Sequence, residues 1–387
     1  MANVSSSNGL EKCPKLRFPG FDEPWKICKA ESLFRNITEK NHPDDTVLTI
    51  VQGKGTLPRE KSGRNIHYDD ASLSNYKRVE KGDYIIHLRS FEGGLEMAHE
   101  TGIVSPAYTI LRCSKPHSSL FYEAYFHTDE FINHVLSKAV EGIRDGRQIS
   151  YEAFKWLGIP YCSNAEQEKI SALFDALNRR IEKQEQIVNA LKKYKRGVTN
   201  AIFSKNLRFA SKEVTYPNWE QKYIGDICKI QTGKSNTQDE TVHGSFPFYV
   251  RSPIVRKSNR YLFDCEAVLT VGDGVGTGKV FHHVTGKFDL HQRVYAMTDF
   301  KLVSGQYFYY YFSHFFYDRV MRMTAKTSVD SVRYEMIDRM PILIPCKEEQ
   351  SQIVKFLDFL EKEVSGAENK LALLEKLKAG FLQQLFI

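Results

Sequence analysis

Apolar residues recur at alternating steps of four and three along two stretches of the chain. In 170–202, eight of the ten periodic positions are apolar, and in 353–385 nine of ten are. This spacing is typical of a coiled-coil seam. Glu166 and Glu349 stand in the first turn of each stretch, where the positive end of a helix dipole favours negative charge. The pattern predicts two long helices, each about 57 Å in length.

The two stretches are copies of one another. A shift of 183 positions lays 166–203 over 349–386 without a gap and with 11 identical residues. The chain therefore consists of a globular segment and a helix, repeated once. Looser matches keep the same order upstream: FDEPW (21–25) with YPNW (216–219), GDYIIHLRSFEGG (82–94) with DCEAVLTVGDGVGTG (264–278), and LGIPYC (157–162) with ILIPC (342–346).

A helix of this length exceeds what one small domain can cover, so the two apolar stripes most simply cover each other. The globular segment between the helices allows the chain to return, which predicts an antiparallel pair. The alternative, in which each stripe packs on its own globular half, stays open. The residues expected to pack in the spacer helices are Ile170, Phe174, Leu177, Ile181, Val188, Leu191, Ile353, Leu357, Leu360, Val364, Leu371 and Leu374.

The globular segments have mixed patterns, with several strands followed by one helix and a last strand. The fold class is therefore α+β: two globular α/β domains separated by two long antiparallel coiled-coil helices, with an internal pseudo-twofold repeat. The expected divisions are 1–163, 164–205, 206–346 and 347–387. The clearest expected elements are strands at 46–52, 82–89, 105–113, 246–250, 266–272, 293–300 and 340–345, and helices at 119–140 and 305–321.

Length and composition agree with packed cores rather than disorder. The chain has 387 residues, of which 42% are hydrophobic, enough for two or three domains. No window approaches an uninterrupted membrane span, and the start lacks a basic segment followed by an apolar one, so we expect a soluble cytoplasmic protein. Seven cysteines without a Cys-x-x-Cys pair fit reduced core residues better than disulfides or a zinc site.

The charge is moderately basic and unevenly placed. The formal net charge is +7, and the excess lies in 165–204 and 205–345. The clusters KKYKR (192–196) and RSPIVRKSNR (251–260) suit contacts to phosphates, since each neutralised phosphate releases condensed counterions. A solvated basic face is the alternative, and at 192–196 the cations also suit the end of a helix.

Polar loops supply further candidates for contacts to DNA. Residues 291–293 read His-Gln-Arg just before a strand, and such side chains can read base edges. The loop QGKGTLPREKSGR (52–64) is the polar counterpart in the first half, although an ordinary surface loop is an equal alternative. The candidate DNA-binding residues are Gln52, Lys54, Arg59, Lys61, Arg64, Arg89, Lys234, Arg251, Arg256, Lys257, Arg260, Lys279, His291, Gln292 and Arg293.

Catalytic and nucleotide-binding motifs are missing from the sequence. The glycine-rich stretch VGDGVGTGK (271–279) has Asp273 and Val280 where a phosphate-binding loop needs Gly and Ser or Thr, and Thr277 breaks the dinucleotide pattern. There is no HExxH, no G-x-S-x-G and no Asn/Asp-Pro-Pro-aromatic tetrapeptide. We therefore expect no catalytic residue and no metal ligand in this chain. A weak nuclease-like grouping of Asp44, Asp45 and Lys54 is the one enzymatic alternative.

Several of these motifs resemble the DNA-specificity subunits of type I restriction-modification enzymes. The resemblance runs from PKLRFPGF (14–21) to the end of the chain and rests on the order and duplication of its parts. These parts are KLRFPGF, the pair IPYCSNAEQEKI and IPCKEEQSQI before the helices, and the endings KKYKRGVTNAIFS and KLKAGFLQQLF.

The resemblance implies two target-recognition domains, each reading one half of a bipartite, asymmetric double-stranded DNA sequence. It implies that the paired helices fix the spacing between the half-sites and dock methyltransferase (modification) subunits, two in number, through which restriction subunits with helicase and nuclease activity join. S-adenosylmethionine, ATP and magnesium would then be bound by the partners and not by this chain. A scaffold that binds only proteins is a third reading.

One feature departs from a regular repeat. The segment SGAEN (365–369) makes the second helix less regular than the first, and Gly366 is expected to loosen the seam locally.

Overall fold

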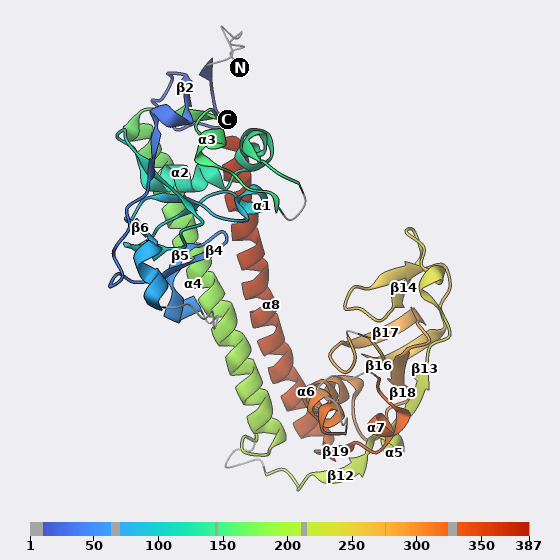
Figure 1. The fold of residues 1–387 in the computed structure, drawn as a ribbon. Helices are drawn as coiled ribbons and strands as arrows, with labels where there is room; N and C mark the ends of the chain where they lie inside the picture. Colours follow the sequence, from blue (N-terminus) through green and yellow to red (C-terminus); the bar gives the residue numbers. More distant parts are fainter. Residues whose placement is uncertain are drawn as a thin grey trace. The chain divides into compact units, whose positions relative to one another are not determined.

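The computed structural model describes residues 11–62, 70–143, 146–209, 215–274, 276–323 and 331–386. The chain divides into unit 1, formed by 1–185 and 369–387, and unit 2, formed by 186–368. The predicted mixed fold with two long helices is confirmed: α4 spans Asn164–Phe203 and α8 spans Lys347–Gln384. Each long helix gives one half to each unit (Figure 1).

Unit 1 is built from small antiparallel sheets around an aromatic core. The sheet β3-β10-β7-β8 packs against the short helix α2 through Phe34, Tyr84 and Tyr122. A second sheet, β1-β2-β11, leads directly into α4. The elements are β1 (Glu11–Lys12), β2 (Trp25–Lys29), β3 (Phe34–Ile37), β4 (Leu48–Val51), β5 (Gly55–Pro58), β6 (Lys77–Val79), β7 (Tyr84–Ile86), α1 (Ser90–Gly93), β8 (Glu96–Met97), β9 (Gly102–Val104), β10 (Thr109–Cys113), α2 (Ser119–Phe126), α3 (Tyr151–Phe154) and β11 (Gly158–Tyr161).

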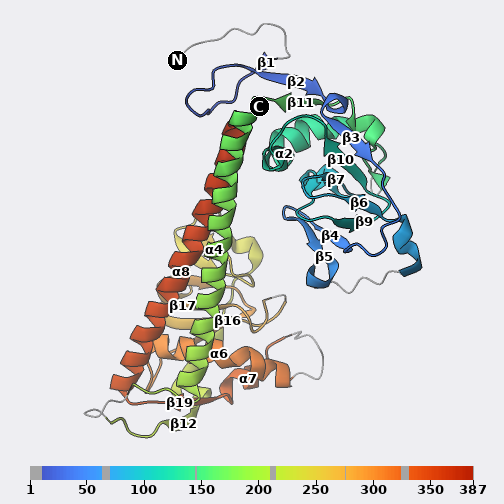
Figure 2. The ribbon, with the colours of Figure 1, turned by 90° about the vertical axis from the view of Figure 1, so that its left-hand side faces the viewer.

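Unit 2 has a larger sheet of six strands in the order β13-β18-β16-β17-β14-β15. Helix α6 packs on β16 and β17 (Figure 2). The hairpin-like pair β12-β19 leads into α8, as β2-β11 leads into α4. The elements are β12 (Glu220–Tyr223), α5 (Ile224–Ile227), β13 (Lys229–Thr232), β14 (Phe246–Tyr249), β15 (Arg256–Ser258), β16 (Phe263–Val271), β17 (Phe281–Leu290), β18 (Val294–Thr298), α6 (Gly305–Met323), α7 (Tyr334–Asp338) and β19 (Pro341–Ile344).

The long helices lie side by side within each unit and run antiparallel. In unit 2, Lys192 forms an ion pair with Glu368, and Lys195 forms one with Glu361. Residue numbers therefore rise along α4 in the direction in which they fall along α8. The first turns of each apolar stripe, however, pack into the adjoining globular core. Each apolar stripe therefore packs partly against a globular core and partly against the other long helix. Its buried members are Ile170, Phe174, Leu177, Val188, Ile353, Leu357, Leu360, Val364 and Leu374, and Ile181, Leu191 and Leu371 are half-buried.

Each core is closed by the end of the long helix that arrives from the other half of the sequence. Phe386, just beyond α8, lies among Trp25, Phe121 and Tyr125 of unit 1. Phe203, at the end of α4, lies against Tyr307 and Tyr311 of unit 2. Because these two phenylalanines are equivalent in the repeat, the two units use the same closure.

One expectation about a helix was wrong. Residues 119–140 do not form one helix: α2 ends at Phe126, and a π-helical turn (Glu130–Val135) and a 3₁₀ turn (Leu136–Ala139) follow. The buried Thr128 causes the break, because its hydroxyl donates to Tyr125 O and accepts from Phe131 N, as at a helix start. The helix α8 continues unbroken through Gly366, since one glycine costs only about 1 kcal/mol.

All seven cysteines are free thiols. Among the described residues, no helix is both long and apolar enough to span a membrane.

Candidate nucleic-acid interface

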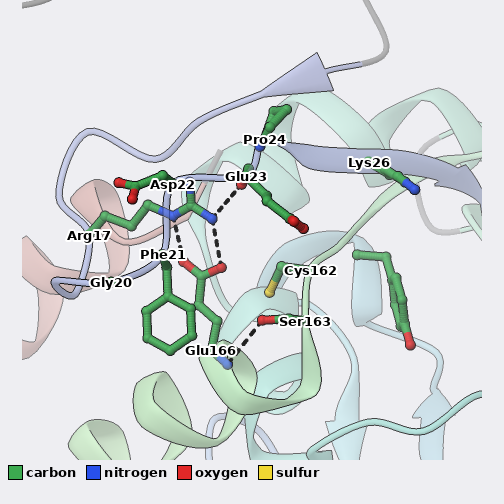
Figure 3. Close-up of a pocket in the computed structure, with 11 residues that line it drawn as sticks. Arg17, Gly20, Phe21, Asp22, Glu23, Pro24, Lys26, Cys162, Ser163 and Glu166 are labelled. Atoms are coloured by element: carbon green, nitrogen blue, oxygen red, sulfur yellow. Dashed lines mark hydrogen bonds and ion pairs between the residues drawn. The ribbon is translucent and has the colours of Figure 1, made fainter.

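Each globular segment is fixed to its long helix by a buried glutamate in the helix's first turn. In unit 1, Arg17 binds Glu166 through two hydrogen bonds of 2.7 and 2.9 Å, and Trp25 Nε1 donates to the same carboxylate at 3.0 Å. Figure 3 shows Arg17 reaching Glu166 beside Phe21 and Cys162, in a cavity of about 510 Å³. The hydrogen bonds with Glu166 raise the pKa of Arg17.

Unit 2 repeats this anchor with equivalent residues. Arg208 binds Glu349 at 2.9 and 2.6 Å, and Trp219 Nε1 donates to it at 2.8 Å. The glutamine that follows each glutamate is also repeated. Gln167 and Gln350 each accept the backbone N–H at the start of the domain helix, from Ser118 and Ser304 respectively, at 3.1 Å. A duplicated set of contacts therefore holds two otherwise different domains.

The candidate surface of unit 1 is the turn between β4 and β5, which carries Gln52 and Lys54, both exposed. The turn rests on Glu96, whose carboxylate is 0% exposed and accepts the N–H groups of Gly53 at 2.6 Å and Gly55 at 2.8 Å. The side chain of Gln52 lies across α1, where a Cβ at Gly93 would be 1.9 Å from Gln52 Nε2. Glu96 therefore fixes the backbone of the turn, and α1 contacts the side chain of Gln52.

A histidine completes the support of this turn. His127 Nε2 lies 3.3 Å from Glu96. Burial opposes ionisation of both groups, but their mutual hydrogen bond and charge, together with the Gly53 and Gly55 amides, leave the pKa of Glu96 lowered and that of His127 raised. The nearby His99 binds Glu123 at 2.7 Å, which also raises its pKa. The turn therefore sits over a cluster whose charge depends on pH.

The remaining candidates of unit 1 do not all lie near this turn. Arg59 and Lys61 lie in the 3₁₀ turn Arg59–Ser62 directly after β5. Arg89 precedes α1, on which Gln52 rests. Arg64 lies outside the described residues. The structure thus brings Gln52 and Arg89 to one region and keeps Arg59 and Lys61 at the far end of the hairpin.

The candidate surface of unit 2 is formed by loops at one end of the six-stranded sheet. The segment after β13 follows the end of β17, because Lys234 N and Ser235 N both donate to Leu290 O and Gln292 N donates to Ser235 O at 2.8 Å. A Cβ at Gly233 would lie 2.0 Å from Leu290 O, so only glycine allows this approach. Backbone contacts therefore fix Lys234 and Gln292 next to each other.

The arginines of this surface are paired with acids. Arg251 and Arg293 flank Asp273 at 3.3 and 3.4 Å. Arg256 binds Glu240 at 3.1 Å. Arg260 contacts both Asp239, at 2.8 Å, and the buried Asp289, at 3.5 Å. All four arginine side chains remain between 44% and 62% exposed, so the acids orient them without covering them.

The other candidates of unit 2 differ in access. Lys234, Lys257 and Gln292 are exposed. Lys279 lies over the ring of Tyr317 at 5.0 Å. His291 is only 4% exposed, and its Nδ1 accepts the backbone N–H of Arg293. Its burial and the charges of Arg251 and Arg293 lower the pKa of His291, so the ring shapes the turn as a neutral group.

The nuclease-like grouping gains no support from the geometry. Asp45 forms an ion pair with Arg78 at 3.3 Å. Within the described ranges, no group of three or more His, Cys, Asp or Glu side chains is placed to hold a metal ion.

Sequence reasoning missed the acids that organise both surfaces. Glu96, Asp239, Asp273 and Asp289 were not candidates, because a search for contacts to DNA selects cations and amides. The anchors were missed as well, although the signal exists: the tripeptide Leu-Arg-Phe occurs at 16–18 and again at 207–209. Both copies begin with a leucine whose N–H donates to the end of a long helix, at Gln384 O and Ala201 O.

Comparison with known proteins identifies what the chain is similar to. Residues 216–376 match the family model of the type I restriction modification DNA specificity domain. The type I restriction enzyme EcoDI specificity subunit of Escherichia coli is 25% identical over 169 residues, which are 43% of this chain and 36% of that protein. The MjaVIII specificity subunit of Methanocaldococcus jannaschii is 24% identical over 181 residues, 44% of this chain and 42% of the relative.

The match to each curated relative therefore covers less than half of the relative's length. Among solved structures, the S subunit of a type I restriction-modification system from M. genitalium superposes with a TM-score of 0.64 at 15% identity, covering 97% of this chain and 99% of that one. At this identity the likeness concerns the fold, which the two chains share over almost their whole lengths.

Proposed function

We propose that this chain, whose residues 216–376 match the family model of the type I restriction modification DNA specificity domain, recognises a bipartite, asymmetric DNA sequence for such an enzyme complex. The observation that carries the proposal is the contrast between the repeated anchors and the unrepeated loops. The contacts of Glu166 and Glu349 are the same, whereas the β4–β5 turn of unit 1 has no counterpart among the loops around Asp273 and Arg260 in unit 2.

Two unlike surfaces on one chain suit an asymmetric target. A symmetric dimer reads two copies of one half-site, whereas a chain with two different readers can bind two different half-sites. In this proposal the loops of unit 1 contact one half of the target and those of unit 2 the other. The basic residues supply phosphate contacts, and the amide and guanidinium groups supply base contacts.

The long helices take two roles in the proposal. They set the number of unread base pairs between the half-sites, because DNA rises about 3.4 Å per base pair and a helix about 1.5 Å per residue. They also dock two methyltransferase subunits, and restriction subunits join through these. The chain itself is non-catalytic, and the partners bind S-adenosylmethionine, ATP and magnesium.

Methylated-motif mapping tests the proposal. The chain is expressed in cells with its modification subunit, and then again with residues 211–345 replaced by the corresponding segment of a relative. We expect one half of the methylated sequence to change while the other half and the spacing stay the same. A change in both halves, or in neither, would contradict the assignment of one reader to each unit.

A second experiment separates this function from the nuclease alternative. The purified chain alone should neither methylate nor cut DNA with or without magnesium. Metal-dependent cutting that is lost in Asp44→Ala would instead support the enzymatic alternative. Binding that shows neither salt dependence nor sequence preference would support the protein scaffold.

A further inference from the structure

A fully buried carboxylate lies beneath the loops of unit 2. Asp289, near the end of β17, is 0% exposed. Its Oδ1 accepts from Ser235 Oγ at 2.6 Å and from Leu290 N at 2.9 Å. Its Oδ2 has no hydrogen-bond partner among the described residues and lies 3.5 Å from Nε of Arg260. A buried charge is unfavourable unless it is paired, so this carboxylate depends on Arg260.

Arg260 is held in place although its side chain is 59% exposed. Its Nη2 donates to Ser235 Oγ at 2.9 Å and to Asp239 Oδ2 at 2.8 Å, which uses both hydrogens of that nitrogen. An exposed arginine normally loses considerable rotamer freedom when it is fixed. Here the guanidinium plane is fixed before any ligand arrives, and the two hydrogens of Nη1 form no hydrogen bond in the described part of the chain.

The group of charges around Arg260 differs in net charge from the neighbouring group around Arg251 and Arg293. Arg260 faces two carboxylates, Asp239 and Asp289, so the network has a formal charge of −1. Arg251 and Arg293 share one carboxylate, Asp273, which leaves +1. A phosphate is attracted to the second group and not to the first. A neutral acceptor is a better ligand for Arg260, and the major-groove edge of guanine offers two acceptors, N7 and O6.

We propose that Arg260 reads a guanine in the DNA half-site of unit 2, positioned by Asp289, Asp239 and Ser235, while Arg251 and Arg293 contact phosphates. This inference rests on the proposed DNA recognition and adds to it a division of labour among the arginines. The positioning follows a physical requirement: reading a base edge needs N–H groups that point in a defined direction, here the two of Nη1, whereas a phosphate accepts a cation in many orientations.

Two matched lysine substitutions test the division. The full chain, together with its modification subunit, is bound to duplexes that carry the methylated sequence or each of its single-base variants, over a range of salt concentrations. Arg260→Lys keeps the charge but removes the planar guanidinium and its fixed Nη1 hydrogens, so discrimination at one G·C pair of the second half-site should fall by about 5- to 150-fold. The salt dependence should stay unchanged. Arg251→Lys should leave both discrimination and salt dependence close to the parent.

Removing the charges gives the complementary result. Arg251→Gln and Arg293→Gln should each weaken binding to all sequences and reduce the slope of log K against log salt by about 1. Asp289→Asn tests the positioning role: it should relax preference at the same base pair as Arg260→Lys and should have little further effect in the double variant. Because Asp289 is buried, Arg260→Lys on the exposed side chain keeps the test valid if Asp289→Asn fails to fold.

The outcomes distinguish the inference from the proposed function. If the parent complex shows no sequence preference, DNA recognition itself is refuted. A second outcome is that the parent complex is specific while Arg260→Lys, like Arg251→Lys, leaves base discrimination close to the parent, or changes the salt dependence rather than the preference at one base pair. In either case Arg260 is a phosphate contact and the inference is wrong. If discrimination is lost at an A·T pair, the arginine reads a base other than guanine and that part of the inference fails.

Discussion

Replacing Phe386 by alanine should destabilise unit 1 and leave unit 2 intact. Phe386 is 5% exposed, and its ring lies 5.3 Å from Phe121, 5.8 Å from Tyr125 and 5.9 Å from Phe174. Removing a buried phenylalanine costs about 3–5 kcal/mol. This is a large share of the roughly 5–15 kcal/mol that stabilises a domain. The loss should fall on unit 1 because every one of these neighbours belongs to it.

Hydrogen exchange measured by mass spectrometry reports the two units separately. In the Phe386→Ala variant, the slowest amides of β2, β11 and α2 should exchange about 10²- to 10⁴-fold faster, since each 1.4 kcal/mol is a factor of ten. The slowest amides of β16 and α6 should exchange as in the parent. Phe203→Ala should give the opposite pattern, because Phe203 is 2% exposed in the core of unit 2.

A matched control lies on the same helix. Phe359 of α8 is 55% exposed, so Phe359→Ala should change stability by less than about 0.5 kcal/mol. The reasoning would be refuted if Phe386→Ala accelerated exchange equally in both units, or if it had no larger effect than Phe359→Ala. Either result would mean that the helix ends do not close the cores.

Four further predictions concern the anchors, the reader of unit 1 and the helices. Glu166→Gln should destabilise unit 1, and Glu349→Gln unit 2, by about 3–5 kcal/mol in denaturant unfolding followed by unit-specific exchange, because Arg17 or Arg208 loses its buried partner. The lowered pKa of Glu96 makes its stabilisation present above about pH 4.5 and lost as pH falls further, whereas the raised pKa of His127 makes its stabilisation present below about pH 6.5 and lost as pH rises. The contribution of His127 should therefore be lost between pH 6 and pH 8, whereas burial lowers the pKa of His87 and His117, so their contributions change in the opposite direction. In urea titrations of unit 1, His127→Gln should lower the free energy of unfolding more at pH 6 than at pH 8. A four-residue insertion near Gln184 together with one near Ala367 should change the spacing between the methylated half-sites or abolish methylation, and an unchanged spacing would count against the spacer role. Leu374→Asp, which places a charge at a buried helix position, should lower the midpoint of thermal unfolding, and an unchanged midpoint would place that stripe in solvent.

The repeat and the long helices could be predicted from the sequence because their signals are local and periodic. The seam repeats every seven residues, and the shift of 183 aligns 38 positions without a gap. The anchors could not be found by that shift. The tripeptides around Arg17 and Arg208 are 191 residues apart, so they fall out of register with the helices. Their partners, Glu166 and Glu349, are the very residues that the shift aligned, but a first-turn acid alone indicates only a favourable helix dipole.

The candidate DNA-binding loops were only partly predictable for a different physical reason. Cations and amides at 251–260 and 291–293 were visible as candidates because their chemistry suits DNA. Which of them is oriented, and toward what, depends on acids brought from distant segments: Asp273 joins Arg251 and Arg293, and Asp289 joins Arg260. No local pattern links these residues, since the contacts arise only when β14, β16 and β17 have assembled.

Under the proposed function, the contacts explain how one scaffold can carry two readers that differ in sequence. The interactions shared by both units, from the arginine–glutamate anchors to the closing phenylalanines, involve the long helices and the strands that enter them. The reader loops contribute none of these shared interactions. The supports of the loops are instead local to each unit: Glu96 holds a turn in unit 1 and Asp289 holds an arginine in unit 2. A change in one of these loops therefore alters its own support without weakening the scaffold, which is the separation that the proposed reading of two independent half-sites requires.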